Sequence, residues 1–562
     1  MSPVVTDTPD ELVRRFVEDG THVHLATTTG RPNALLYALC RAFADRHSLV
    51  VSVASVHSSA HALALSGAVR HLTTCFLGDT YPTPKPCKLY SRLREGVPFH
   101  AEIWSLLSHT QRLAAAANGL PYAVTTSLVG SQLPVATGRS LPDLTRLPGT
   151  PPSLLVPALR PDITFLHGVL ADRRGNIVLC PPYGEGPHTA YAATGGVVAT
   201  VERIVPDEVV AAAPANVKVP GVKVIGLCEA PWGGHPQSLR CDGLAGLPDY
   251  YLDDYPFLAE ISKACAAPET ARDWYRRWVQ DPDGHRGYLS LLGQDRLHAL
   301  AGDSARRADR PPAVPPDDPC TDQERLILLA ARGIATLVRE HGYRTLLAGV
   351  GSAHMAAWTA RQLLARDGIQ VELLAELGFY GVAPDSGDPF LFSQRHADRA
   401  TMTAGIEQIL GGVVGEKSLG VIGAVEVDAT GAVNTAFLPD GRWLTGPGGA
   451  NDVGTKSDTV VVAKATRARY VPSVAHVTTP GGRVQAVFSQ FGAFSRATAT
   501  DPFTLATWLP SREDADGTAG PRELTAANTQ WCPPPRPVRR EAAITADERA
   551  VLASLDPEGI YR

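Results

Sequence analysis

Cysteine is scarce in this sequence, and the few cysteines form no ligand or disulfide pattern. Nine occur in 562 residues, none is arranged as C-x-x-C, and no cluster of histidines accompanies them. An odd number of cysteines in a chain of this length argues against a disulfide framework and against a zinc site. We therefore predict no bound metal, and we expect reduced, buried thiols of the kind found in cytoplasmic proteins.

Long apolar runs are also absent. No stretch of about 18 apolar residues occurs, so the sequence predicts no transmembrane helix. The first residues, MSPVVTDTPDE, contain neither the basic nor the apolar region of a signal peptide. These absences favour a cytoplasmic protein without a membrane partner.

An excess of positive charge is missing as well. The chain has 52 Lys and Arg against 57 Asp and Glu, a formal net charge of −5, and no basic stripe. A nucleic-acid partner therefore has little support. Apolar residues make up 44% and charged residues 19%, as in ordinary soluble globular proteins. The length is sufficient for two to four domains.

One segment has the composition of a linker. Residues 303–319 read DSARRADRPPAVPPDDP, without apolar periodicity, so this segment should be exposed and extended. It predicts a first domain over 1–302, a linker over 303–320 and a second domain over 321–530. Residues 531–562 are polar and Pro-rich, and we expect a surface-wrapping tail with a short helix at 546–554.

Strand and helix patterns alternate in both halves of the chain. The expected strands are 21–27, 48–56, 344–350 and 371–375, and the expected helices are 33–44, 322–340 and 355–365. This alternation is typical of a mostly parallel sheet with helices on its faces, so we predict an α/β fold.

The two halves contain a similar turn. Residues 168–177 read GVLADRRGNI and residues 423–434 read GAVEVDATGAVN, and in each an apolar stretch leads to Asp-x-x-Gly. Asp commonly begins such a turn, and Gly takes its positive-φ position. Two similar α/β units in tandem explain the match, although two short turns can also agree by chance.

Two groups of motifs carry a family resemblance. The first group is RLAAAANGLPY at 112–122, ADRRGNIVL at 171–179, VPGVKVIGLCEAPWGGHP at 219–236 and DYYLDDY at 249–255. The second group is LLAELGFYG at 373–381, GAVEVDATGAVNTAF at 423–437 and GPGGANDV at 446–453. They resemble, in order, the two subunits of a family I coenzyme A transferase of the glutaconate type. The chain looks like both subunits fused, and the resemblance covers most of residues 10–530.

This resemblance implies a fold and a reaction. The fold would be two tandem, related open α/β sandwich domains (the CoA transferase or NagB-RpiA-like fold), with the active site where they meet. The reaction would move coenzyme A from an acyl-CoA to a carboxylic acid, through an acyl-glutamyl anhydride and a glutamyl-CoA thioester. No permanently bound cofactor is implied, because coenzyme A is itself a substrate.

Glu376 is the nucleophile that the resemblance implies. It follows the mostly apolar run 371–375, so it should lie at the C-terminal end of a buried strand, where α/β sheets bind ligands. Gly378 would let the backbone turn closely around substrate. Leu377 departs from the small residue usual in the family and would narrow the acyl pocket or change the acceptor. Without the resemblance, a glutamate that pairs at a strand end is the simpler interpretation.

The glycine-rich loop at 446–452 is the second predicted element of the site. Consecutive glycines expose backbone N–H groups that can bind the oxyanion of a tetrahedral intermediate. The resemblance implies this role for Gly448 and Gly449, with Gly446 and Asn451 contacting the substrate. A plain tight turn, with Asn451 fixing the loop, is the simpler alternative.

Other candidates lie at loops in both halves. Gly349 and Gly351 end a strand and open a helix, where they would hold a phosphate or a pantetheine amide. Gly30 and Arg31 belong to a loop that resembles one lining the family's cleft. Glu102 falls near a family position that carries an acid beside the active site, and an exposed helical glutamate is the alternative. We expect Gly30, Arg31, Gly349 and Gly351 to bind substrate, and Glu102 to assist catalysis.

Other functions remain open at this stage. A hydrolase would pass the CoA ester to water, cleaving a thioester or a C–C bond, and a biosynthetic acyltransferase would pass the acyl group to another nucleophile. Retention of Glu376 favours transfer and argues against a non-enzymatic acyl-CoA binder. The sequence does not identify the acid, whose carboxylate could pair with Arg31, Arg361 or Arg395. It also does not determine the oligomeric state, and a homo-oligomer is one of the alternatives.

Overall fold

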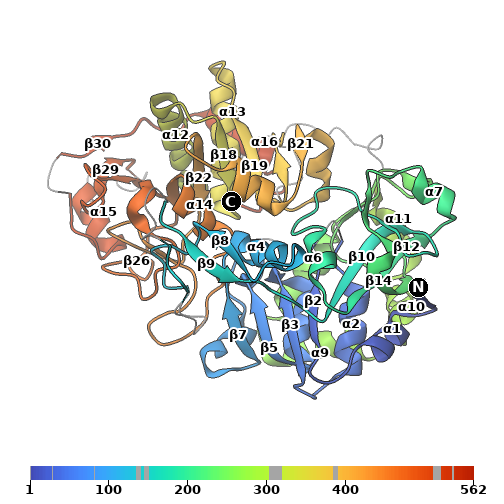
Figure 1. The fold of residues 1–562 in the computed structure, drawn as a ribbon. Coiled ribbons are helices and arrows are strands. Elements are labelled where there is room, and N and C mark those ends of the chain that lie inside the picture. Colours follow the sequence, from blue (N-terminus) through green and yellow to red (C-terminus); the bar gives the residue numbers. More distant parts are fainter. Residues whose placement is uncertain are drawn as a thin grey trace.

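The chain builds one large, mostly parallel sheet in each half, and the two lie side by side (Figure 1). The computed structural model describes residues 2–27, 30–81, 83–133, 141–144, 151–302, 319–383, 390–510, 520–534 and 537–562. Nearly all of the predicted linker, residues 303–318, lies outside the described residues. The domain boundaries stay predictions.

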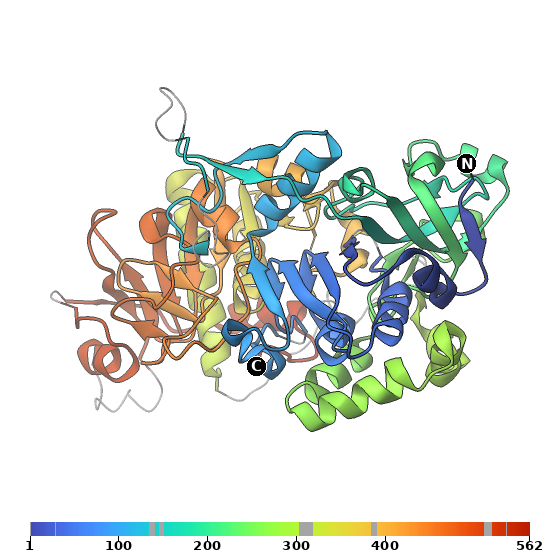
Figure 2. The same ribbon diagram turned by 60° about the horizontal axis from the view of Figure 1, so that its bottom comes forward.

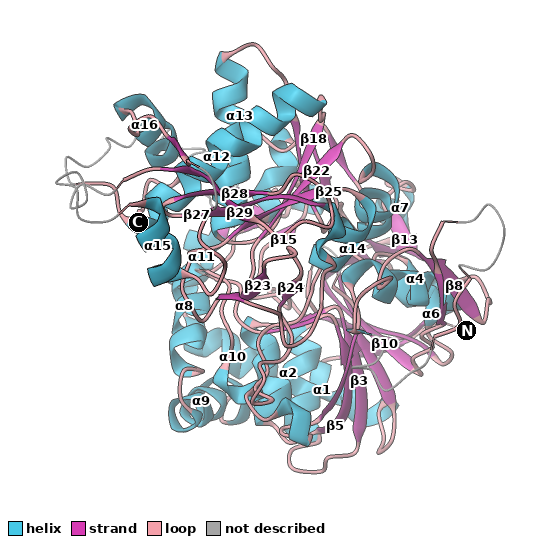
Figure 3. Ribbon diagram, turned by 90° about the vertical axis from the view of Figure 1, so that its left-hand side faces the viewer, coloured by secondary structure: helices cyan, strands magenta, loops and turns pink. Residues whose placement is uncertain are grey.

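The first sheet is parallel along its main path. In spatial order its strands are β1 (Val4–Thr6), β14 (Val224–Glu229), β12 (Gly196–Ile204), β10 (Ile163–Ala171), β2 (His22–Leu25), β3 (Leu49–Val53), β5 (Val69–Thr74) and β7 (His100–Ile103). All nine residues of β10 are buried, as expected for a parallel strand covered on both faces. Helices α1 (Pro9–Phe16) and α2 (Asn33–Ala42) lie on one side of this sheet, with α4 (Leu106–Ala117) and α6 (His188–Ala192) on the other (Figure 3).

The second sheet has a parallel centre with antiparallel pairs toward its edges. Its strands, in spatial order, are β21 (Met402–Thr403), β20 (Phe379–Tyr380), β19 (Glu372–Ala375), β18 (Thr345–Ala348), β22 (Ser418–Ile422), β25 (Asp458–Val462), β27 (Val484–Ser489), β28 (Gly492–Ser495), β29 (Thr504–Trp508) and β30 (Arg539–Arg540). Helices α12 (Asp322–His341) and α13 (Ser352–Arg366) pack against each other on one face of this sheet. Helix α16 (Ala546–Leu555) packs against both of them. The predicted α/β fold is confirmed.

The two sheets repeat the same arrangement of parallel strands. The order β14-β12-β10-β2-β3 in the first half matches β27-β25-β22-β18-β19 in the second. The similar turns also match, because Gly175 N–H bonds the Asp172 carbonyl at 3.0 Å and Gly431 N–H bonds the Asp428 carbonyl at 2.9 Å. Both glycines have positive φ, +88° and +84°. This agreement over whole sheets makes chance similarity of two turns an inadequate explanation.

The local sequence patterns located the elements well. The predicted helix at 322–340 is α12, which begins at a capping box formed by Thr321 and Glu324. The predicted strand at 371–375 is β19. The helix expected from residue 355 instead begins at Ser352, because Gly351, with φ of +82°, turns the chain directly into it. The tail forms the expected helix, α16, and then continues to the cavity described below.

A group of short helices completes the first half. Helices α8 (Tyr255–Ala264), α9 (Pro268–Tyr275), α10 (Gly284–Leu292) and α11 (Gln294–Leu300) follow one another in the sequence and gather beside α1 and α2 (Figure 2). All nine cysteines are unpaired, and seven are buried. Within the residues described here, every helix is too short or too polar to cross a membrane.

Candidate active site

A cavity of about 640 Å³ opens between the two halves. Its walls include Ala54 and Ser55 beyond β3, Glu376 and Leu377 beyond β19, and the loop 446–450. Because β3 and β19 occupy equivalent places in the two sheets, the cavity lies where the C-terminal ends of equivalent strands face each other. Such strand ends are where α/β folds bind ligands. Residues 560–562 of the tail also reach the wall.

Glu376 stands at the end of β19 with its carboxyl group in this cavity. The strand before it is largely buried and paired with β18, which fixes its direction. Two residues later, the backbone reverses into β20. Gly378 makes the reversal possible, since its φ is +132° and a Cβ there would overlap the Ala404 carbonyl. Gly378 therefore forms the turn that holds Glu376, in line with its expected role in the backbone, and its place in substrate binding stays a prediction.

Burial raises the pKa of the Glu376 carboxyl from 4.5 to about 7. Desolvation is the largest cause, and the negative charge of Asp452 adds to it. A hydrogen bond from the Gly449 backbone N–H acts in the opposite direction. The ionised form is thus less stable than in water, and a desolvated carboxylate of this kind is a stronger base and nucleophile than an exposed one.

The raised pKa predicts a pH dependence of turnover. Only the carboxylate can attack, so kcat/KM should fall about tenfold per pH unit below about pH 7 and level off above it. We expect Asp452→Asn to move this acidic limb to lower pH, because it removes the charge that opposes ionisation of Glu376. A pH profile with a single low-pH limb near 4.5 in the wild type would contradict the assignment.

The glycine loop places only one of its two expected N–H donors beside Glu376. Gly448 N–H already donates to the Cys75 carbonyl at 3.1 Å, so it is not directed at substrate. Gly449 N–H bonds the Glu376 carboxylate, and a Cβ on Gly449 would overlap Glu376 Oε2. Gly446 lines the cavity with φ of +99°, and a Cβ there would lie 2.6 Å from the Cys75 carbonyl. The predicted pair of oxyanion donors is therefore reduced to Gly449.

Asn451 joins the two halves instead of facing the cavity. It is the second residue of α14 (Ala450–Lys456) and is fully buried. It accepts from Leu128 N–H at 2.8 Å and donates to the Thr478 carbonyl at 2.8 Å. The neighbouring Asp452 accepts from Leu107 N–H at 2.9 Å. These bonds tie the glycine loop to the first half, so the predicted substrate contact of Asn451 is corrected to a structural role.

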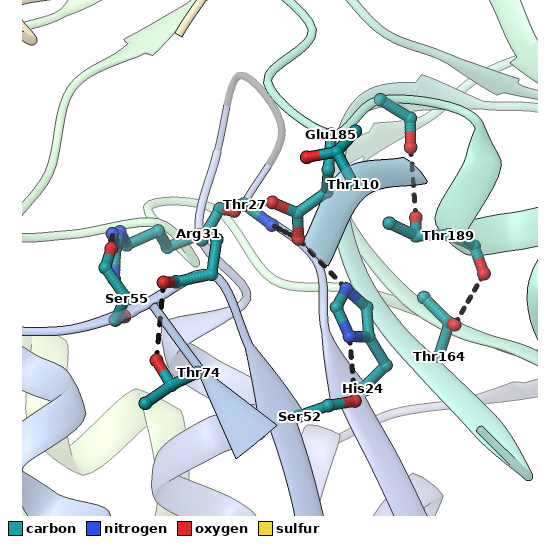
Figure 4. Close-up of polar contacts among 12 residues, drawn as sticks. His24, Thr27, Arg31, Ser52, Ser55, Thr74, Thr110, Thr164, Glu185 and Thr189 are labelled. Carbon is teal, nitrogen blue, oxygen red and sulfur yellow. Dashed lines mark hydrogen bonds and ion pairs between the residues drawn. The ribbon is translucent and has the colours of Figure 1, made fainter. Parts of the chain in front are cut away.

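Arg31 brings a positive charge from the first half to the cavity wall. Its guanidinium donates to the Ser55 carbonyl at 3.1 Å and to Ser55 Oγ at 2.7 Å (Figure 4). It also lies 2.7 Å from His57 Nε2. Burial lowers the Arg31 pKa to about 10, which leaves it charged at neutral pH. Within the described residues, no carboxylate forms an ion pair with it. Gly30 stays behind the wall, bridged to His167, where a Cβ would meet Leu239 at 2.8 Å.

Gly349 and Gly351 line the cavity on the second-half side. Gly349 N–H donates to the Val421 carbonyl at 2.8 Å, so this amide is used within the sheet. Gly351 precedes α13, a helix of 15 residues whose first turn meets the cavity at Ser352 and Ala353. The N–H groups at a helix start can bind an anionic or polar ligand, and the role of Gly349 and Gly351 in holding a phosphate or a pantetheine amide stays a prediction.

Glu102 is held by neighbours within the first sheet. It lies on β7, is 6% exposed, and accepts from Trp104 Nε1 at 3.0 Å and from Thr73 Oγ1 at 3.3 Å. Among the described residues, Glu102 is not one of those that line the cavity. The alternative of an exposed helical glutamate is wrong, because Glu102 is buried on a strand, and a catalytic role for Glu102 stays a prediction.

Glu185 is a buried first-half acid that contacts the cavity-lining Thr27, and no pattern in the sequence pointed to it. It accepts from Thr27 N–H at 3.0 Å and from the Thr27 hydroxyl, and it lies 2.9 Å from His24 Nε2 (Figure 4). Burial alone would raise its pKa, but these interactions hold the pKa at about 2. Thr27 itself lines the cavity. No local motif marks Glu185, since its partners are more than 150 residues away in sequence.

Comparisons with known proteins agree with this geometry. The family model described as coenzyme A transferase matches residues 6–229. The chain is 33% identical to one subunit of the 3-oxoadipate CoA-transferase of Pseudomonas knackmussii, over 48% of this chain and 92% of that protein. It is 26% identical to one subunit of the glutaconate CoA-transferase of Acidaminococcus fermentans, over 53% and 94% respectively.

One similar solved structure extends over both halves. It is an acyl-CoA transferase from Escherichia coli O157:H7 in a thioester complex with CoA, with a TM-score of 0.63 and 15% identity. The match covers 98% of this chain and 96% of that one. At this identity the match shows the fold, and it extends beyond residues 6–229, the part that the family model matches.

Proposed function

This chain belongs to the coenzyme A transferase family, and we propose that it moves coenzyme A from an acyl-CoA to a carboxylic acid with Glu376 as the covalent nucleophile. The observation that carries the proposal is the position of Glu376, whose carboxyl group lies in the cavity between the halves and is bonded by Gly449 N–H. A partly buried, desolvated carboxylate next to one fixed backbone donor suits nucleophilic attack on a thioester.

The proposed reaction proceeds through two covalent forms of Glu376. The carboxylate attacks the thioester carbonyl, and CoA thiolate leaves to give an acyl-glutamyl anhydride. The thiolate then attacks the glutamyl carbonyl, which releases the first carboxylic acid as its anion and leaves a glutamyl-CoA thioester. The incoming carboxylate attacks this thioester, and the expelled thiolate attacks the new acyl carbonyl. Glu376 is regenerated, and the thioester bond is conserved throughout.

Gly449 N–H supports the steps at the glutamyl carbonyl. When thiolate or acid attacks that carbon, negative charge develops on a Glu376 oxygen, and the N–H is already hydrogen-bonded to this carboxylate. A preorganised donor costs no reorganisation when the charge forms, and the partly dry cavity strengthens the interaction. Position 449 must be a glycine because a side chain there would overlap Glu376 Oε2.

A trapping experiment tests the proposal directly. Protein incubated with an acyl-CoA but no acceptor acid, then treated with borohydride or hydroxylamine, should carry a modification on the peptide that contains Glu376. Addition of an acid should yield its CoA ester. Release of CoA thiol without an acid acceptor, and without any adduct, would instead indicate a hydrolase.

We further propose that the acceptor is a dicarboxylic acid whose second carboxylate binds Arg31. Two similar curated proteins are named for 3-oxoadipate and glutaconate, which are both dicarboxylates. Arg31 supports the proposal because it is charged, lines the same cavity as Glu376, and is held in place by Ser55 and His57. A planar guanidinium binds a carboxylate through paired hydrogen bonds.

Substitution of Arg31 should weaken the binding of dicarboxylic acids much more than the binding of monocarboxylic acids. For Arg31→Met we expect KM for a dicarboxylic acid to rise about 100-fold, the value of a lost charge-assisted hydrogen-bond pair. KM for a monocarboxylic acid of similar length should change little. Arg361→Met is the matched control, because Arg361 lies on α13 away from the cavity wall. Equal losses for both classes of acid would contradict the role of Arg31.

A further inference from the structure

A second group of reactive side chains is buried behind the cavity wall in the first half. His61, Cys87 and Cys265 each present a ligand atom, and these three atoms lie within 4.8 Å of one another. Their exposed fractions are 0%, 3% and 2%. His61 ends a 3-10 turn (Ser58–His61), Cys87 precedes another (Lys88–Tyr90), and Cys265 directly follows α8. Three distant segments thus converge on one point.

The surroundings of His61 resemble the support that proteins give a metal-bound imidazole. His61 Nε2 lies 3.0 Å from Asp79 Oδ1. The other Asp79 oxygen accepts from Ser262 Oγ at 3.1 Å and lies 4.0 Å from Lys85 Nζ. A carboxylate on one ring nitrogen fixes the tautomer and leaves the other nitrogen's lone pair available. That other nitrogen, Nδ1, now lies 2.8 Å from the Tyr90 hydroxyl.

We propose that His61, Cys87 and Cys265 bind one zinc ion. Two thiolates and one imidazole are ligands that Zn²⁺ prefers, at about 2.3 Å from sulfur and 2.0 Å from nitrogen. Ligand atoms of a tetrahedral site are roughly 3.4–3.8 Å apart at these bond lengths, so small side-chain rotations close the site. Binding releases the two thiol protons to solvent, and a water molecule would complete the tetrahedron.

Such an ion would fix one wall of the cavity. Thr83, Pro84, Lys85 and Pro86 line the cavity, and Cys87 follows them directly. A bond from Cys87 through zinc to Cys265 anchors this segment to the end of α8. The sequence predicted no metal site because the three ligands lie 26 and 178 positions apart, without any short spacing motif. The proposal replaces that expectation.

Metal analysis of the full chain tests the proposal without any activity assay. Protein produced in zinc-supplemented medium should contain one zinc per chain by mass spectrometry of the element. Replacement by cobalt should give the near-ultraviolet absorption of thiolate-to-cobalt charge transfer. Cys87→Ala and Cys265→Ala should each lose both signals, whereas Cys40→Ala, which removes a buried thiol outside the cluster, should keep them.

The wild-type measurement decides the question even if a variant fails to fold. Wild-type protein that contains no zinc and binds no cobalt overturns the proposal, and so does a Cys87–Cys265 disulfide in the purified chain. Retention of stoichiometric zinc by folded Cys87→Ala also overturns it. A chelator should lower the Tm of the wild type and of Cys40→Ala, and should leave the Tm of Cys87→Ala unchanged.

Discussion

Glu376→Gln is expected to lower kcat by about 10⁴-fold or more, the scale seen when a covalent nucleophile is removed. Glutamine keeps the size of the side chain and can still accept the Gly449 hydrogen bond, but its amide cannot attack a thioester. The substitution therefore tests the chemistry separately from the shape of the cavity. Steady-state transfer between an acyl-CoA and an acid measures the loss, and mass spectrometry should find no adduct on the variant.

Glu372→Gln is the matched control for this experiment. Glu372 opens the same strand, β19, but lies at its other end, away from the cavity wall. We expect kcat within about twofold of the wild type, since surface changes away from a site have small effects. Substrate binding should survive in Glu376→Gln, so KM or Kd for acyl-CoA should change little. Wild-type turnover by Glu376→Gln would rule out the proposed mechanism.

Gly449→Ala should lower kcat by about 100-fold to 1,000-fold, as other disrupted oxyanion sites do. Alanine retains the backbone N–H, so the loss of activity would come from a steric clash and not from a missing hydrogen-bond donor. The added Cβ would occupy the position of Glu376 Oε2 and must displace the carboxylate. The rate of adduct formation on Glu376 in single-turnover experiments measures the effect, because it reports the first covalent step without product release.

Gly448→Ala separates this steric effect from general damage to the loop. A Cβ on Gly448 meets nothing within 4 Å, but its φ of +51° is unfavourable for alanine. We expect a loss of about 1 kcal/mol in the free energy of unfolding with a far smaller change in kcat than in Gly449→Ala. If the two variants lost activity equally while both remained folded, the distinct role of Gly449 would be refuted.

The candidate active site shows which features local sequence patterns can predict and which they cannot. Glu376 could be placed at a strand end because the apolar run before it and the glycine after it are neighbours in sequence. The oxyanion donors could not be told apart, since the group that occupies Gly448 N–H is the carbonyl of Cys75, in the other half. The contacts of Glu185 could not be foreseen for the same reason, since His24 and Thr27 are more than 150 residues away in sequence.

The sequence by itself determined the alternation of strands and helices, the turn glycines and the position of Glu376 in its strand, because backbone preferences and apolar periodicity act over a few residues. The tertiary structure alone decided which polar groups meet. It desolvated Glu376 and raised its pKa, paired Asn451 with Leu128 N–H, and brought His61 close to Cys87 and Cys265. Desolvation and hydrogen bonding depend on neighbours in space, and here those neighbours come from segments far apart in the chain.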